Sequence, residues 1–477
     1  MKAGRHLRPL NLIVIVNVIG YGLLYLYKKP YDNYILIAGL AAIFLIGLGY
    51  SAIKLMKLGD GYLFLIAGML SSIGIIMLYR LDRDLGFKQI IWFATGIVLF
   101  FISCLLFRRF RIWERLVYLY PLASLLLFAV TLFFGTNIKG AKNWIIIGSF
   151  SIQPSEVIKI LFVFFVAGYL KLYESNFKEA EVFKVGKLAV RPVHVLIVVS
   201  FMHLGFMVVQ QEWGTALMIF MVYFMLFYVF VNDIPYLVIN AVLAVAGGLA
   251  GVLFVNHIRI RVDTWLDPWK DIAGTGYQIT QSLFAIGAGG FFGTGLGLGR
   301  PDFIPEVETD FIFSAVCEEM GIFGGAAVVL LYFILTYRGF KIALSLKNQF
   351  TKVLAFGITL VFGFQTFIIV GGVIKLIPLS GITLPFISYG GSSLVVSFIA
   401  LGILQAVSAG PSARWVDAEL SALRTDAAPP AMKADTMPDT APEAAPEARP
   451  ETRPVDAPEA APEAAPEAVS SSGEGGD

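Results

Sequence analysis

Charged side chains are scarce in this chain of 477 residues. Asp, Glu, Lys and Arg make up 15% of it, against roughly 25% in an average soluble domain. Apolar residues reach 57%, and the mean hydropathy is +0.76. This composition excludes a typical soluble enzyme, a disordered protein and a nucleic-acid-binding protein as descriptions of the whole chain. It indicates a polytopic membrane protein with no nucleic-acid partner.

Cysteine and histidine are scarce as well. The two cysteines, Cys104 and Cys317, both lie in apolar segments, and two thiols make neither a disulfide framework nor a metal cluster. The four histidines show no HExxH or other metal-ligand spacing: His6, His194, His203 and His257.

Long apolar runs fill most of the chain. A spanning helix needs about 20 mostly apolar residues, and the sequence predicts an all-α polytopic membrane protein with about twelve transmembrane helices. The first run is followed by Lys28, Lys29 and Pro30 without a small-residue cleavage site, so we expect a retained helix rather than a signal peptide. The runs lie at 10–27, 34–56, 62–80, 90–107, 116–134, 157–173, 193–210, 214–231, 236–255, 312–336, 353–373 and 392–408.

Basic residues in the short loops predict the orientation of these helices. With twelve spans, four clusters of Lys and Arg fall on one face, which makes that face cytoplasmic and places both termini there. Lys28 and Lys29 in the first outer loop count weakly against this. Three long segments then face outside, at 135–156, 256–311 and 374–391. The basic clusters lie at 2–8, 108–115, 178–191 and 338–352.

The chain ends in an acidic tail. Residues 411–477 hold 14 acidic and 5 basic residues and 11 of the 22 prolines, so residues 1–410 carry a net charge of +11. Repeats of Ala-Pro-Glu-Ala cannot bury enough apolar surface to offset the entropy lost on ordering. We therefore divide the chain into two extra N-terminal helices (1–61), a membrane domain (62–408) and a disordered cytoplasmic tail (409–477).

Several ionisable groups lie at membrane depth, where each costs about 2.5–3.5 kcal/mol at a helix centre. Glu156 and Lys159 are one turn apart and can pair, either as an interfacial ion pair or as part of a site. Glu212 lies in the turn between two predicted helices and could cap the second. Glu318 and Glu319 are too deep for simple solvation, so at least one is predicted to face a polar cavity.

The long outer loop, 256–311, combines basic residues with glycines. The glycines at 293–299 have the wrong spacing for a dinucleotide-binding motif. They could form flexible turns, or their amides could bind a phosphate beside the basic groups.

Asp310 ends this loop and precedes a predicted helix. Residue type alone favours helix capping, since Asp is a preferred N-cap. The alternatives are a general base or a ligand for a divalent cation.

Together, the motifs of residues 62–408 resemble the SEDS family (shape, elongation, division and sporulation), whose members include FtsW, RodA and SpoVE. The resemblance is slightly closer to FtsW, on Phe386-Ile387-Ser388. It is carried by Asn143-Trp144, Gln153-Pro-Ser-Glu156 with Lys159, Arg261, Leu266-Asp-Pro-Trp269, Gly276-Tyr-Gln278 with Gln281-Ser282, Gly293–Gly299, Thr309-Asp-Phe-Ile-Phe313, Glu318-Glu319 with Gly321, and Pro385-Phe-Ile-Ser-Tyr389-Gly-Gly-Ser-Ser393.

This resemblance implies a peptidoglycan glycosyltransferase that polymerises lipid II, the undecaprenyl-pyrophosphate-linked disaccharide peptide, on the outer face of the bacterial cytoplasmic membrane. It implies that Asp310 is the catalytic base rather than a cap. It also implies a divalent cation, Mg²⁺ or Mn²⁺, with Asp310 as a ligand. Further substrate contacts are expected from Lys142, Gln153, Glu156, Lys159, Glu212, Arg261, Glu319 and Ser388.

The sequence departs from the family pattern at three places. Gln210-Gln211-Glu212 stands where Gln-Pro-Asp is usual, Glu308 stands where His is frequent, and two helices precede the usual ten. The expected partners are a class B penicillin-binding protein and other divisome or elongasome membrane proteins. Two alternatives remain, a lipid II flippase and a non-catalytic scaffold for that transpeptidase. The sequence does not separate division, elongation and sporulation.

Overall fold

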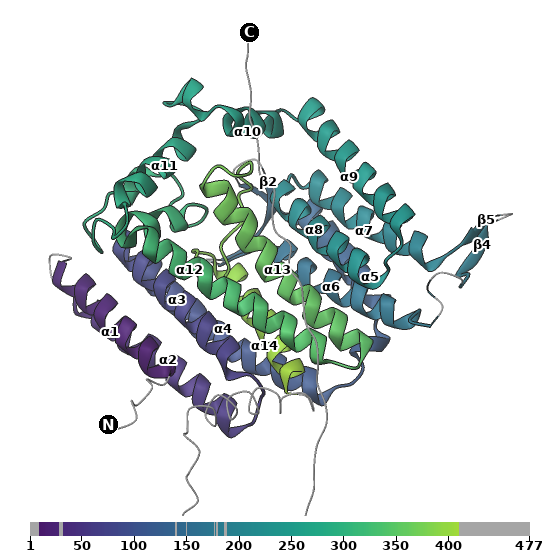
Figure 1. Ribbon diagram of the computed structural model, residues 1–477, viewed down its shortest axis with the longest axis horizontal. Coiled ribbons are helices and arrows are strands. Elements are labelled where there is room, and N and C mark those ends of the chain that lie inside the picture. The colour runs from purple at the N-terminus through teal and green to yellow at the C-terminus, as the bar shows by residue number, and fades with distance from the viewer. Residues whose placement is uncertain are drawn as a thin grey trace, which may run out of the picture. The chain divides into compact units, whose positions relative to one another are not determined.

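The computed structural model describes residues 9–27, 32–138, 141–148, 150–175, 177, 180–185 and 188–409 (Figure 1). The predicted disordered tail lies outside the described residues from residue 410 onward. Each of the twelve predicted apolar segments falls on one long helix. These helices are α1 (Pro9–Tyr27), α2 (Asn33–Leu55), α3 (Gly61–Leu81), α4 (Arg83–Arg109), α5 (Leu119–Phe134), α6 (Pro154–Leu172), α7 (Pro192–Val209), α8 (Trp213–Phe230), α9 (Ile234–Phe254), α12 (Ile312–Ser345), α13 (Gln349–Val373) and α14 (Gly391–Ser408).

The predicted class, an all-α polytopic membrane protein, is confirmed. Within the described residues, ten helices are long and apolar enough to cross a membrane. The two others of the predicted twelve are α5, which has 16 residues, and α6, which carries Glu156, Lys159 and Lys171 in 19 residues. The count of twelve spans therefore stays a prediction.

Helices α3, α6, α13 and α14 are the most buried of the bundle, and α9 lies at its edge (Figure 1). In the 18-residue stretch of highest hydropathy in each helix, 83% is buried in α3 and in α14, against 11% in α9. A helix that is apolar all round suits either a core or a lipid environment, so burial rather than hydropathy separates the two groups.

The two N-terminal helices pack against each other and against α3. Asp32 caps α2 by accepting from the amide of Tyr34 at 3.0 Å. Gly39 of α2 faces the ring of Tyr21 in α1, where a Cβ would lie 2.7 Å from the ring. The absence of a side chain at Gly39 thus allows the close approach of α1 and α2.

The segment after α5 forms a small sheet that the all-α prediction did not include. Strands β1 (Thr136–Ile138), β2 (Ala141–Ile147) and β3 (Phe150–Ile152) are antiparallel in that order. Gly148 turns the chain between β2 and β3 with φ of +61°, a conformation that favours glycine. A second hairpin joins β4 (Phe183–Val185) to β5 (Leu188–Val190), and a short 3₁₀ helix spans Trp113–Arg115.

The long loop 256–311 folds into short helices. It contains α10 (Asn256–Leu266), the 3₁₀ helix Pro268–Asp271, α11 (Tyr277–Gly289) and the 3₁₀ helix Pro301–Phe303. Helix α11 packs along α12. Gly321 interrupts the helical geometry of α12 with φ of +69°.

Residues 379–390, which we call the inner segment, fold back among the helices between α13 and α14. Its residues 384–388 are buried. Gly74 of α3 makes room for it, since a Cβ there would lie 2.4 Å from the carbonyl oxygen of Ile387. Phe386 has φ of +69°, a strained conformation for a bulky residue that the surrounding structure must maintain.

Candidate active site

Asp310 lies beside a guanidinium group at the end of the long loop. The N-cap residue of α12 is Phe311, one position after Asp310. The capping role that residue type alone favours for Asp310 is therefore wrong. A Cβ added to Gly381 would lie 3.4 Å from both terminal nitrogens of Arg261 and 3.6 Å from Oδ2 of Asp310. The two charged groups therefore border the same face of Gly381, which has φ of +71°.

Arg261 reaches this place from α10. Its Nη1 donates to the carbonyl oxygen of Leu379 at 2.9 Å. Desolvation lowers the pKa of Arg261, and the negative charge of Asp310 opposes that effect. The structure thus brings together two residues that the sequence singled out 49 positions apart.

The backbone next to Asp310 is held by the inner segment. The hydroxyl of Ser388 donates to the carbonyl oxygen of Thr309 at 2.6 Å and accepts from the amide of Leu384 at 2.9 Å. The amide of Tyr389 donates to the carbonyl oxygen of Glu308 at 2.8 Å. Ser388 is thus engaged in internal bonds, which make it a support for Asp310, while its predicted contact with substrate stays a prediction.

A second cluster surrounds Glu212 in the turn between α7 and α8. Its Oε1 accepts from Nε2 of Gln153 at 3.1 Å and from the hydroxyl of Ser155 at 3.0 Å. Burial raises the pKa of Glu212, although Gln153, Ser155 and Asn143 oppose the shift. Glu212 is the residue before α8 but makes no capping bond, so the capping role considered for it is wrong.

A third cluster connects α6 to the inner segment. Glu156 and Lys159 form an ion pair at 2.8 Å, as predicted from their spacing, and both are buried. Lys159 also donates to Oε1 of Gln365 at 3.2 Å, and Nε2 of Gln365 donates to the carbonyl oxygen of Thr383 at 2.7 Å. Sequence reasoning missed Gln365, although a lone amide inside an apolar helix is a usable signal.

The three clusters meet at the inner segment. Gly381 borders Asp310 and Arg261, and the carbonyl of Thr383 accepts from Gln365. Gly214, two residues after Glu212, packs against Ser380, where a Cβ would lie 2.4 Å from its carbonyl oxygen. The segment after α13 therefore joins Asp310, Glu212 and the Glu156–Lys159 pair into one region.

Glu318 and Glu319 lie apart from this region and bind the glycine-rich loop. Arg80 pairs with Glu319 and donates to the carbonyl oxygen of Gly299 at 2.6 Å. The amides of Gly297 and Arg300 donate to Glu319 and Glu318 at 3.0 and 2.6 Å.

These bonds do not test the expectation that one of the two glutamates faces a polar cavity, which stays a prediction. The chain's own carboxylates occupy the amides of Gly297 and Arg300, so these two amides are not available to a phosphate, and the phosphate hypothesis for the rest of the loop stays a prediction. The predicted contact of Glu319 with substrate stays untested, and the structure gives Glu319 a structural role.

Two further parts of the predicted site are Lys142 and a divalent cation. Lys142 pairs with Asn137 in the β1–β2 ladder, and its side chain lies outside the described part of the chain. Among the described residues, no group of three His, Cys, Asp or Glu side chains could hold a metal ion. The protein groups at Asp310 thus do not form a metal site by themselves.

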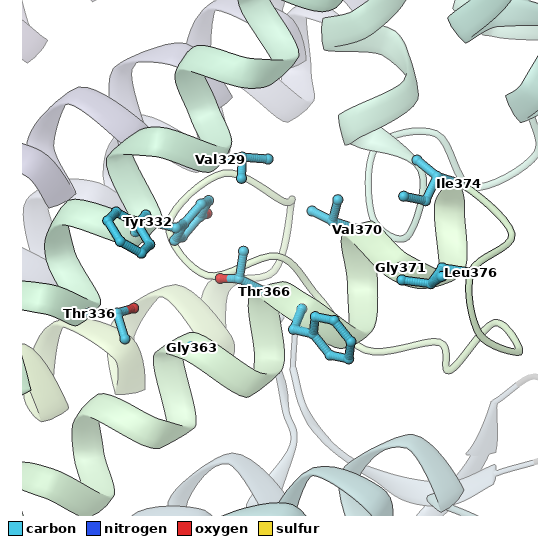
Figure 2. A pocket seen from close by; sticks show the side chains of 11 residues that line it. Val329, Tyr332, Thr336, Gly363, Thr366, Val370, Gly371, Ile374 and Leu376 are labelled. Atoms are coloured by element: carbon cyan, nitrogen blue, oxygen red, sulfur yellow. The ribbon is translucent and has the colours of Figure 1, made fainter. Parts of the chain in front are cut away.

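An apolar cavity of about 390 Å³ lies between α12 and α13 (Figure 2). Tyr332 and Thr366 are among its lining residues, but their hydroxyls donate to the carbonyl oxygens of Pro385 and Phe362. The cavity thus offers apolar surface and includes none of the predicted site residues. Its other lining residues are Val329, Phe333, Thr336, Gly363, Phe367, Val370, Gly371, Ile374 and Leu376.

Comparison with known proteins places the chain in a family. Residues 61–412 match the model of the FtsW/RodA/SpoVE family, described as cell cycle protein. The chain is 37% identical over 388 residues to the peptidoglycan glycosyltransferase RodA of Mycobacterium tuberculosis, covering 78% of this chain and 83% of that protein. It is 34% identical over 365 residues to the stage V sporulation protein E of Bacillus subtilis, covering 73% and 96%.

A solved structure supports the same assignment. It is described as the structural coordination of polymerization and crosslinking by a peptidoglycan synthase complex. It has a TM-score of 0.61 and 27% identity, and the match covers 73% of this chain and 97% of that one. Since the family model spans most of the chain, this protein belongs to the FtsW/RodA/SpoVE family of cell cycle proteins.

Proposed function

We propose that this protein is a peptidoglycan glycosyltransferase that polymerises lipid II into glycan strands, with Asp310 as its general base. The observation that carries the proposal is the placement of the Asp310 carboxylate beside the Arg261 guanidinium at Gly381. The named activity of the RodA relative supports the reaction class. Gln365 of α13 bonds to the inner segment beside this pair, Gly214 of α8 packs against that segment, and Lys159 of α6 bonds to Gln365.

The chemistry follows from these two side chains. Asp310 accepts the proton of the acceptor sugar hydroxyl, whose oxygen attacks the anomeric carbon of the growing glycan. The new C–O bond forms as the bond to the lipid pyrophosphate breaks, and the pyrophosphate leaves with the bonding electrons. Arg261 offers paired donors that suit a phosphate oxygen geometrically and electrostatically.

A divalent cation, Mg²⁺ or Mn²⁺, remains part of the proposal in a limited sense. The described residues offer the Asp310 carboxylate at this place and no cluster of three ligands. Mg²⁺ is often held by one or two carboxylates together with substrate phosphates, so the pyrophosphate would have to supply most of the ligands. When bound, such an ion would neutralise charge on the leaving pyrophosphate, while the roles of Asp310 and Arg261 given above belong to the chain's own residues.

The cellular setting of the proposal comes from charge and from the relatives. The basic clusters in short loops support cytoplasmic termini and an active site on the outer face of the bacterial plasma membrane. The peptidoglycan synthase complex supports a class B penicillin-binding protein as partner, next to other divisome or elongasome membrane proteins. The role in division, elongation or sporulation stays open between the named relatives.

The test is polymerisation of purified lipid II by the purified chain, with and without its cognate transpeptidase. The proposal is supported if wild type forms glycan strands and Arg261→Gln does not. A scaffold would give no strands from either protein. A flippase would move lipid II across a vesicle bilayer equally well with Arg261→Gln and would also make no glycan.

A further inference from the structure

Four polar side chains from outside the inner segment donate to its backbone carbonyls, in addition to the apolar packing of its buried residues. They are Arg261 to Leu379, Gln365 to Thr383, Tyr332 to Pro385 and Gln89 to Ser388. Phe386 within the segment keeps a positive φ, which a bulky residue adopts only where its surroundings enforce it. The segment in turn fixes residues 308 and 309 through Tyr389 and Ser388. The geometry at Asp310 therefore depends on whatever fixes the inner segment.

Gln365 is the side chain that connects the inner segment to the buried ion pair. It is 2% exposed and uses both ends of its amide. Lys159 can only donate and the carbonyl of Thr383 can only accept, so Oε1 must face Lys159 and Nε2 must face Thr383. These bonds measure 3.2 and 2.7 Å. An apolar side chain can make neither bond, and an ionised carboxylate can make only the first.

We propose that Gln365 is a positioning residue for glycosyl transfer, which holds the inner segment on the Glu156–Lys159 pair and thereby holds the backbone that carries Asp310. The inference rests on the proposed function for its kinetic readout. Gln365 does not contact Asp310, so its effect on the reaction passes through Thr383 and Ser388. Misplacing a catalytic group by about 1 Å can cost on the order of 100-fold in rate.

The chain supplies a matched control in Gln405 of α14. This glutamine is 0% exposed, and its Nε2 donates to a backbone carbonyl, that of Leu58, at 2.8 Å. It resembles Gln365 in residue type, burial and bonding to a loop carbonyl, but none of its bonds reaches the inner segment. A general loss of packing should therefore affect both variants equally.

The experiment compares Gln365→Leu, Gln365→Glu and Gln405→Leu in the full-length protein, with lipid II as substrate. We expect Gln365→Leu to lower kcat about 10- to 100-fold with KM within about threefold. The backbone that carries Asp310 moves, while Arg261 stays on α10 and Lys159 keeps its ion pair with Glu156. Gln365→Glu keeps the acceptor for Lys159 and should lose kcat similarly. Gln405→Leu should keep wild-type kcat at a comparable loss of melting temperature.

A second measurement does not depend on turnover. Amide hydrogen exchange should rise in peptides covering residues 304–313 and 380–390 of Gln365→Leu, and around Leu58 in Gln405→Leu. Unchanged exchange at 304–313, equal kcat loss in the two leucine variants, or wild-type kcat in Gln365→Glu would each overturn the inference. Because exchange is read without catalysis, failure of the glycosyltransferase proposal would leave this result standing.

Discussion

Replacing Glu212 separates a structural contribution from a catalytic one. The Glu212 carboxylate accepts from Gln153 and Ser155, and its other oxygen, Oε2, is buried without a partner. Oδ1 of Asn143 is also buried without a partner. Alanine would leave the Gln153 and Ser155 donors unsatisfied at about 1–3 kcal/mol each. We therefore expect Glu212→Ala to lose on the order of 2–6 kcal/mol of stability.

Glutamine should behave differently, with a sign that depends on pH. Because burial raises the pKa of Glu212, the folded protein favours the protonated carboxyl. Its stability therefore falls as pH rises from the ordinary pKa of glutamate, 4.5, through the raised folded value. Glu212→Gln keeps an acceptor for Gln153 and Ser155 and adds a donor in place of Oε2. It should equal wild type at acidic pH and exceed its melting temperature at pH 8.

The assay is thermal unfolding of detergent-solubilised protein between pH 5 and pH 8, together with lipid II turnover per folded molecule. We expect Glu212→Ala to melt well below wild type and Glu212→Gln to retain turnover within a few-fold. If Glu212→Ala kept the wild-type melting curve while turnover vanished, Glu212 would have to be a catalytic group. A Glu212→Gln protein as unstable as Glu212→Ala at pH 8 would refute the pKa argument.

Three further predictions follow from other parts of the chain. Truncation after Ala409 should leave lipid II polymerisation near the wild-type rate, since a Pro/Ala/Glu repeat has no apolar face to pack; a large loss with intact protein would reject this. Arg80→Met should cost about 3–5 kcal/mol by leaving buried Glu319 without its cation, measured as a fall in melting temperature. Arg83→Met, which breaks a more exposed pair with Asp32, should cost at most about 1 kcal/mol, and equal losses would contradict the argument. Chelation by EDTA should lower turnover, because an ion at the pyrophosphate would neutralise charge on the leaving group. It should not change the melting curve, because the described residues contain no three-ligand cluster. Full turnover in EDTA would remove the cation from the proposal.

Most of the fold could be predicted because long apolar runs have few alternatives to spanning helices. Details that depend on local backbone geometry could not be predicted from the sequence. The kink of α12 at Gly321 depends on a positive φ next to the glycine-rich loop, and Gly321 alone is not diagnostic of a kink. The sheet at β1–β3 was missed because three- to seven-residue strands leave a weak periodic signal.

In the candidate site, too, some features could be predicted from the sequence and others could not. The Glu156–Lys159 pair could be predicted because helix geometry fixes a spacing of three residues. The capping role considered for Asp310 failed because a cap is defined by one residue's backbone, and Phe311 takes that position. Gln365 and Thr383 are 18 residues apart across a turn, and only the folded chain shows that they meet.

The central claim is that Asp310 removes a proton, and Asp310→Asn tests it most directly. The substitution is nearly isosteric and keeps an oxygen at the place beside Arg261, while removing the proton acceptor. A positioned base contributes about 10²–10⁴-fold. The account predicts that purified Asp310→Asn stays monodisperse, melts like wild type and still binds the proposed penicillin-binding partner, yet forms no detectable glycan from lipid II. Glycan formation within a few-fold of wild type would contradict the account.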